Sequence, residues 1–194
     1  MPKEALYEVY SHPLLHKQDL DTICDKHTLV EFRKGEFLLK EGQVSNEYFI
    51  VQQGLVRTFV YNYEGQDITT GFVEDKDVLI EVASIFPRLP TKENMQCITD
   101  VKLWRISFPE FQELFDRIPA FREWGRSWMA LELYKNKNRV TEMITLPATQ
   151  RYLQLMEAHP QVILQSPLKY IASYLGVTDT SLSRIRKEIM EDKG

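Results

Sequence analysis

The sequence predicts an α+β fold in which an antiparallel β-sheet or barrel is followed by helices. Before about residue 107, short runs rich in β-branched and aromatic residues alternate with glycines and other turn residues, which is typical of antiparallel strands. After residue 107, prolines and apolar residues at helical spacing replace that alternation. The expected strands lie in TLVEF, EFLLKEG, NEYFIVQQG, LVRTFVYNYEG, DITTGFV and VKLWRIS, with a hairpin connection at residues 62–65.

Helices are expected on both sides of the strand region. Residues 4–26 carry a helical pattern that places Leu20, Ile23 and Cys24 on one face. Each of the later helices begins at a proline, because the first helical turn tolerates its missing N–H group. The helices expected after the strands cover residues 109–115, 119–145 and 147–160.

Four apolar residues of the long helix follow a heptad-like spacing. Phe121, Trp124, Trp128 and Leu131 are three, four and three positions apart. A long helix between two domains has little cover from its own chain, so these residues are expected to form the seam of a homodimer. The alternative is that they belong to the core of a single protomer.

Composition and charge exclude several classes of protein. No apolar run is long enough to span a bilayer, and the N-terminus lacks a signal-peptide pattern, so we expect a cytoplasmic protein without a membrane partner. Cys24 and Cys97 form no CxxC pair, which excludes a disulfide scaffold and cysteine-based metal sites. The net charge of −4 does not by itself indicate a nucleic-acid partner.

Motifs for catalysis or metal binding are absent from the sequence. It has no phosphate-binding loop and no nucleophile elbow, and no feature brings Glu81 and Glu93 together as an acid–base pair. Because the strand runs contain no histidine, a metal or haem centre in the barrel is not expected. We therefore expect no metal, no cofactor and no enzyme activity. The histidines are His12, His16, His27 and His159.

Residues 166–190 predict a helix-turn-helix. Ser166 followed by Pro167 suits a helix start, with the serine as the capping residue. Gly176 can adopt the left-handed conformation that ends this helix, and Thr178 can cap the next one. The buried face of the first helix is expected to hold Leu168, Ile171, Ala172 and Leu175.

The second helix separates apolar from polar residues by angle. Every residue of its predicted outward face can donate a hydrogen bond, and two are cationic, which suits contacts to base edges and phosphates in a major groove. The alternative is a helical hairpin with an ordinary solvated face. Residues 166–194 carry a net charge of +1, against −5 for the rest of the chain. The inward residues are Leu182, Ile185 and Ile189, and the outward ones are Thr180, Ser183, Arg184 and Lys187.

Together these features resemble the Crp/Fnr family of bacterial transcription regulators over nearly the whole chain. Gly35, Gly42 and Gly54 match turn glycines of that family, VKLWRISFPEF resembles its strand-to-helix exit, and IASYLGVTDTSLSRIRKEI matches its DNA-binding helices. The resemblance implies a cyclic-nucleotide-binding-type β-roll (double-stranded β-helix or jelly-roll type), a long dimerisation helix and a helix-turn-helix. The expected DNA-binding residues are Thr178, Asp179, Thr180, Ser183, Arg184 and Lys187.

The expected effector pocket departs from that of the cyclic-nucleotide-binding members. Glu81 matches the family's ribose-binding glutamate, but Ile80 stands at a glycine position, and Thr91 or Lys92 stands at the phosphate-binding arginine position. A β-branched residue crowds a ligand that approaches the backbone, and neither replacement offers a bidentate cation. We therefore expect no tight binding of cyclic AMP.

The resemblance implies a division into residues 1–118 (sensor roll), 119–145 (dimerisation helix) and 146–194 (DNA-binding domain, with no clear wing). The function expected is that of a sequence-specific DNA-binding regulator, with double-stranded DNA, a second copy of the chain, a small-molecule effector and RNA polymerase as partners. The alternative is a ligand-binding or protein-interaction module that does not bind DNA specifically.

Overall fold

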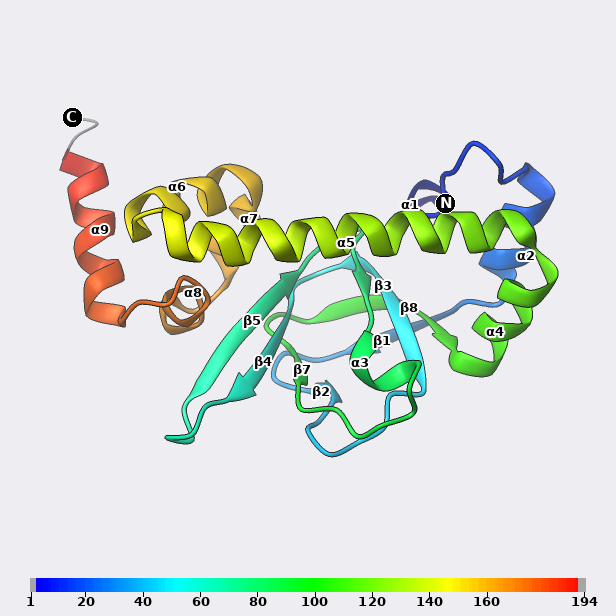
Figure 1. The fold of residues 1–194 in the computed structure, drawn as a ribbon, viewed down its shortest axis with the longest axis horizontal. Helices are drawn as coiled ribbons and strands as arrows, with labels where there is room; N and C mark the ends of the chain where they lie inside the picture. Colours follow the sequence, from blue (N-terminus) through cyan, green and yellow to red (C-terminus); the bar gives the residue numbers. More distant parts are fainter. Residues whose placement is uncertain (1–2, 192–194) are drawn as a thin grey trace.

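The computed structural model describes residues 3–191. A β-roll of two four-stranded sheets occupies the middle of the molecule, and the long helix α5 lies across it (Figure 1). The strands are β1 (Thr28–Phe32), β2 (Phe37–Leu39), β3 (Glu47–Gln53), β4 (Val56–Tyr61), β5 (Asp67–Val73), β6 (Val78–Leu79), β7 (Asn94–Cys97) and β8 (Val101–Ser107). The helices are α1 (Glu4–Val9), α2 (Lys17–Asp25), α3 (Val82–Ile85), α4 (Phe108–Arg117), α5 (Pro119–Thr145), α6 (Ala148–Ala158), α7 (Pro160–Gln165), α8 (Leu168–Tyr174) and α9 (Asp179–Glu191).

The two antiparallel sheets enclose the interior of the roll. Their strand orders are β1–β8–β3–β6 and β2–β7–β4–β5. Apolar side chains from both sheets, among them Val51, Val56, Met95 and Leu103, form one buried cluster between them. Gly54 connects β3 to β4 at a φ of +108°, and a Cβ atom there would lie 2.6 Å from the carbonyl oxygen of Asp100. Only glycine fits this turn, as its place among the expected turn glycines implies.

The expected strand runs all contain strands, and the hairpin at residues 62–65 is confirmed, since Tyr61 pairs with Asp67 across it. Within the roll, β6, β7 and α3 lie outside the predicted runs. They have two, four and four residues, which is too short for a periodic pattern to develop. The predicted helix over 119–145 has the observed bounds of α5, whereas Pro160 opens α7 instead of ending the helical region.

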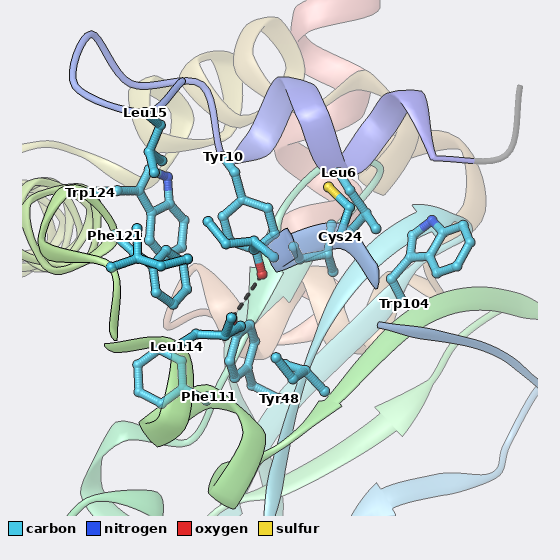
Figure 2. Close-up of a cluster of buried hydrophobic side chains, with 14 residues drawn as sticks. Leu6, Tyr10, Leu15, Cys24, Tyr48, Trp104, Phe111, Leu114, Phe121 and Trp124 are labelled. Carbon is cyan, nitrogen blue, oxygen red and sulfur yellow. Dashed lines mark hydrogen bonds between the residues drawn. The ribbon is translucent and has the colours of Figure 1, made fainter. Parts of the chain in front are cut away.

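The N-terminal helices pack with α4 and the beginning of α5 around a core rich in aromatic residues. Figure 2 shows Phe121 and Trp124 within this cluster beside Tyr10, whose hydroxyl bonds that of Tyr48 at 2.8 Å. The indole Nε1 of Trp124 donates to the carbonyl of Val9 at 2.9 Å. Ile23 and Cys24 are buried in the same cluster, as the helical pattern of residues 4–26 predicts.

The dimer seam expected on α5 is wrong for its first two residues. Phe121 is 0% and Trp124 6% exposed within one protomer, and Trp128 packs against the same cluster. Leu131 is 50% exposed and lines a groove between α5 and β5. The heptad-like spacing arises because α1 and α2, which are distant in sequence, cover this end of α5.

Helices α6 to α9 gather at the other end of α5 (Figure 1). Ile171, Leu182 and Ile185 belong to their core, and Leu55 and Ile98 of the roll are buried in the same cluster. The roll and the C-terminal helices therefore share a hydrophobic core. In residues 3–191, no helix combines the length and apolar character needed to cross a membrane.

Candidate nucleic-acid interface and roll interior

The turn between α8 and α9 has the geometry expected of a helix-turn-helix. Gly176 has a φ of +67°, and the amide of Val177 donates to the carbonyl of Ala172 at 3.0 Å. Thr178 caps α9, because its Oγ1 accepts the amide of Ser181 at 3.1 Å. The cap predicted at Ser166 is wrong: Pro167 occupies the capping position of α8, without a side-chain capping bond.

The two faces of α9 are divided as predicted. Leu182 and Ile185 are buried, and Ile189 packs against the same core. The expected DNA-binding residues Thr178, Asp179, Thr180, Ser183, Arg184 and Lys187 are all exposed. These positions form a surface over the first turns of the helix that consists of hydroxyl and cationic groups and the acidic Asp179.

Two carboxylates that were not among the expected site residues lie beside this surface. Glu188 is 3.7 Å from Arg184 and Glu191 is 3.7 Å from Lys187, each one helical turn further along α9. Both pairs are exposed, and such pairs contribute little to stability. Their i,i+4 spacing is visible in the sequence and could have identified them. In the structure each of these carboxylates pairs with one of the two cations.

Helix α8 contacts the roll directly. The guanidinium carbon of Arg57 on β4 lies 3.4 Å from the ring centre of Tyr170 and 4.0 Å from that of Phe59. Ser173 accepts the amide of Thr69 at 3.2 Å and donates to the Thr69 hydroxyl at 3.0 Å. No sequence signal predicts these contacts, because they join segments more than a hundred positions apart.

In the roll interior, the structure brings Glu81 and Glu93 together. Their carboxyl groups share a hydrogen bond, and burial together with the neighbouring Glu93 raises the pKa of Glu81 to about 7. Thr70 donates to Glu93, and the hydroxyls of Thr70 and Thr58 lie 2.7 Å apart. No sequence feature brings Glu93 to Glu81 or indicates Thr70 and Thr58, because the loops before and after α3 and the pairing of β4 with β5 place these residues together.

The other residues of the expected effector pocket, Ile80, Thr91 and Lys92, lie in three different environments. Ile80 packs against the aromatic core and lines a small apolar hollow with Trp124 and Met129. Thr91 is buried, with its Oγ1 accepting the amide of Glu93 at 2.9 Å, whereas Lys92 is exposed. Of the four expected pocket residues, only Glu81 and Thr91 are therefore both buried and in contact with Glu93. Two adjacent carboxyl groups, one buried and one half-buried, are a poor site for an anionic phosphate, because like charges repel.

The histidines take separate positions. His27 is buried, with its Nε2 2.8 Å from the Tyr10 hydroxyl, and burial lowers its pKa to about 4. His159 Nδ1 lies 2.5 Å from Glu74 Oε1 at the contact between the roll and the C-terminal helices. Over the part of the chain that the structure covers, no three histidine, cysteine or carboxylate residues cluster as metal ligands.

Comparisons with known proteins agree with the architecture. Residues 29–118 match the model of the cyclic nucleotide-binding domain family. A search of curated proteins gives no significant match. CLP, the c-di-GMP-responsive global regulator of Xanthomonas campestris, is 13% identical, with a TM-score of 0.72 over 92% of this chain and 93% of that chain.

Two further solved structures are similar over most of their length. FixK2 of Bradyrhizobium japonicum is 18% identical, with a TM-score of 0.74 over 86% of both chains. A protein described as a Crp/Fnr-family transcriptional regulator from Eubacterium rectale is 16% identical, with a TM-score of 0.71 over 94% of this chain and 88% of that chain. The resemblance to Crp/Fnr regulators is thereby confirmed for the fold.

Proposed function

We propose, from the Crp/Fnr regulator fold of this chain, that it is a cytoplasmic, homodimeric, sequence-specific DNA-binding transcription regulator. The observation that carries the proposal is the surface of α9. Its hydroxyl and cationic side chains are exposed on one face while the opposite face is anchored in the core. A helix held in this way can enter a major groove without losing its own packing.

The side chains of that surface divide into two roles. Thr178, Asp179, Thr180 and Ser183 lie near the start of α9, where a recognition helix reaches base edges. Arg184 can donate two parallel hydrogen bonds to guanine, and Lys187 one turn further on can neutralise a phosphate. On binding, Glu188 and Glu191 give up these two cations to DNA.

The homodimer is proposed to form through a different face of α5 from the expected seam. Met129, Leu133, Val140 and Ile144 are exposed and, at about 100° per residue, fall on one stripe of the helix. Leu133 is 71% exposed, and together the four side chains form a continuous apolar stripe, which is typical of an interaction surface. Asn136 lies within the stripe, where one polar residue can fix the register of two helices.

A cyclic nucleotide is not the effector that the roll interior favours. The phosphate would have to approach the Glu81–Glu93 pair, and Lys92, the nearest candidate cation, is exposed at the surface. Arg88 is held elsewhere, donating to the carbonyl of Ser45 at 2.6 Å. An effector of other chemistry, and contact with RNA polymerase, remain part of the proposed regulator function.

The direct test compares two arginines of α9 on a selected DNA site. Arg184→Ala is expected to weaken specific binding by about 1–3 kcal/mol, because it removes a base contact. Arg186→Ala removes the same charge at an exposed position about 160° away around the helix axis and is expected to weaken binding far less. Equal affinities of the wild type and the folded Arg184→Ala variant, measured at one salt concentration, would contradict the proposal.

A further inference from the structure

Arg57 is a buried cation at the contact between the roll and the helix-turn-helix. It is 2% exposed, and its guanidinium group lies between the rings of Phe59 on its own strand and Tyr170 on α8. Asp67 accepts from Nη2 at 2.7 Å, and Gln96 accepts from the same nitrogen at 3.0 Å. The Nη1 atom has no hydrogen-bond partner within residues 3–191.

This arrangement is more specific than apolar packing requires. A buried charge is costly to desolvate, and an apolar side chain of similar size would cover Tyr170 without that cost. The guanidinium group instead fixes an orientation, because it stacks on the Tyr170 ring while Asp67 and Gln96 accept hydrogen bonds from its edge. The position of Tyr170 is therefore tied to the β4–β5 hairpin of the roll.

Two more arginines hold the other end of α8. Arg139 on α5 donates to the carbonyl of Tyr174 at 3.1 Å and stacks on the Tyr174 ring at 4.2 Å. Arg151 on α6 donates to the carbonyl of Leu175 at 2.8 Å. Both cap the carboxyl end of α8, where carbonyl groups lack partners and the helix dipole favours a cation. Arg57 is the one of these three that belongs to the roll.

The orientation of α8 fixes that of α9. The turn between them is short, with Gly176 in its left-handed conformation and Val177 bonded back to Ala172. Leu182 and Ile185 of α9 pack in the same core as Ile171 of α8. A tilt of α8 against the roll therefore moves α9 with it.

We propose that Arg57 is a positioning residue for DNA recognition, which makes the β-roll part of the unit that sets the spacing of the two recognition helices in the dimer. The inference rests on the proposed function. Arg57 does not touch DNA; it acts through Tyr170 and α8. A dimer reads two half-sites at a fixed separation only if each recognition helix is held rigidly against the rest of its protomer.

The test varies the spacing of two selected half-sites in a DNA duplex. The wild type is expected to bind its best spacing at least about tenfold more tightly than spacings two base pairs away. Arg57→Met keeps apolar cover for Tyr170 but removes the directed cation. It is expected to lose most of this preference, while its affinity for a duplex with one half-site stays within about twofold, because α9 is unchanged. Arg88→Met is the matched control, since Arg88 stacks on Phe108 of α4 at 4.9 Å, away from α8.

A second measurement needs no DNA. Spin labels at Tyr63→Cys on the β4–β5 hairpin and Met190→Cys on α9, both exposed positions, report the distance between roll and recognition helix. With labelled chains diluted into unlabelled ones, the wild type is expected to give one narrow distribution and Arg57→Met a broad one. If folded Arg57→Met keeps both the narrow distribution and the wild-type spacing preference, the inference is wrong. If the wild type selects no DNA while the distributions differ as expected, the proposed function fails and the positioning role of Arg57 stands for α9 alone.

Discussion

At the scale of single residues, the contact between Glu81 and Glu93 changes the pKa of a carboxyl group. The side chain of Glu81 is buried, and its carboxyl group shares a hydrogen bond with the carboxyl group of Glu93. Both circumstances favour the protonated form, so its pKa rises from 4.5 to about 7. The folded chain thus binds this proton more tightly than the unfolded chain does.

The sign of the resulting pH dependence follows from linkage. The stability that Glu81 contributes is fully present below about pH 4.5 and is lost as the pH rises through about 7. Glu81→Gln keeps a hydrogen-bond donor for Glu93 and removes the titration. Relative to the wild type, the variant is expected to gain about 1–2 kcal/mol in free energy of unfolding between pH 4.5 and pH 8, with allowance for solvent screening.

The measurement is denaturant unfolding at several pH values, with Glu64→Gln as control because Glu64 is exposed at the hairpin. A constant difference between wild type and Glu81→Gln over this range would show that the carboxyl pair does not share a proton. The same variant leaves the α9 surface untouched, so its DNA affinity at pH 5 is expected to match that of the wild type.

At the scale of elements, the sequence pattern predicts the bounds of α5 but not the neighbours against which it packs. Its bounds follow from Pro119 and the spacing of its apolar residues. The pattern does not show which face meets which neighbour, because Phe121 and Trp124 are covered by helices about a hundred positions earlier in the chain. A heptad-like spacing has the same form in a dimer seam and in a protomer core, and only the fold decides between them.

The helix-turn-helix could be predicted in more detail because its signals are local. Gly176 ends the first helix in the left-handed conformation and Thr178 caps α9, as predicted, and the buried and exposed faces of α9 are divided as predicted. The contacts that hold this unit in place, Arg57 with Tyr170 and Thr69 with Ser173, depend on strand register and on docking between distant segments. The same holds for the pairing of Glu81 with Glu93.

The proposed dimer stripe on α5 gives a prediction for that element. Leu133→Lys combined with Val140→Lys places charges on the exposed stripe and is expected to give folded monomers at micromolar concentration, since two like charges would be buried in the seam. Leu131→Lys, on the groove side of the same helix, is the control and is expected to stay dimeric. Sedimentation velocity distinguishes the outcomes, and an unchanged dimer in the double variant would contradict the stripe.

At the scale of the whole molecule, the roll, the long helix and the C-terminal helices pack against one another. Leu55 and Ile98 of the roll are buried with the core of the C-terminal helices, and arginines from β4, α5 and α6 converge on α8. This construction presents α9 at the end of the molecule far from α1 and α2 (Figure 1). Two such protomers joined along α5 would present two recognition helices related by a two-fold axis.

Selection of bound duplexes from a random DNA library by the purified full chain tests the account most directly. A two-fold dimer is expected to enrich a near-palindromic site whose half-site centres lie about 10–10.5 bp, or about 34–36 Å, apart. The enrichment should disappear with Arg184→Ala and persist with Arg186→Ala. Absence of any enriched sequence with the folded wild-type dimer, at low and at physiological salt, would contradict the account.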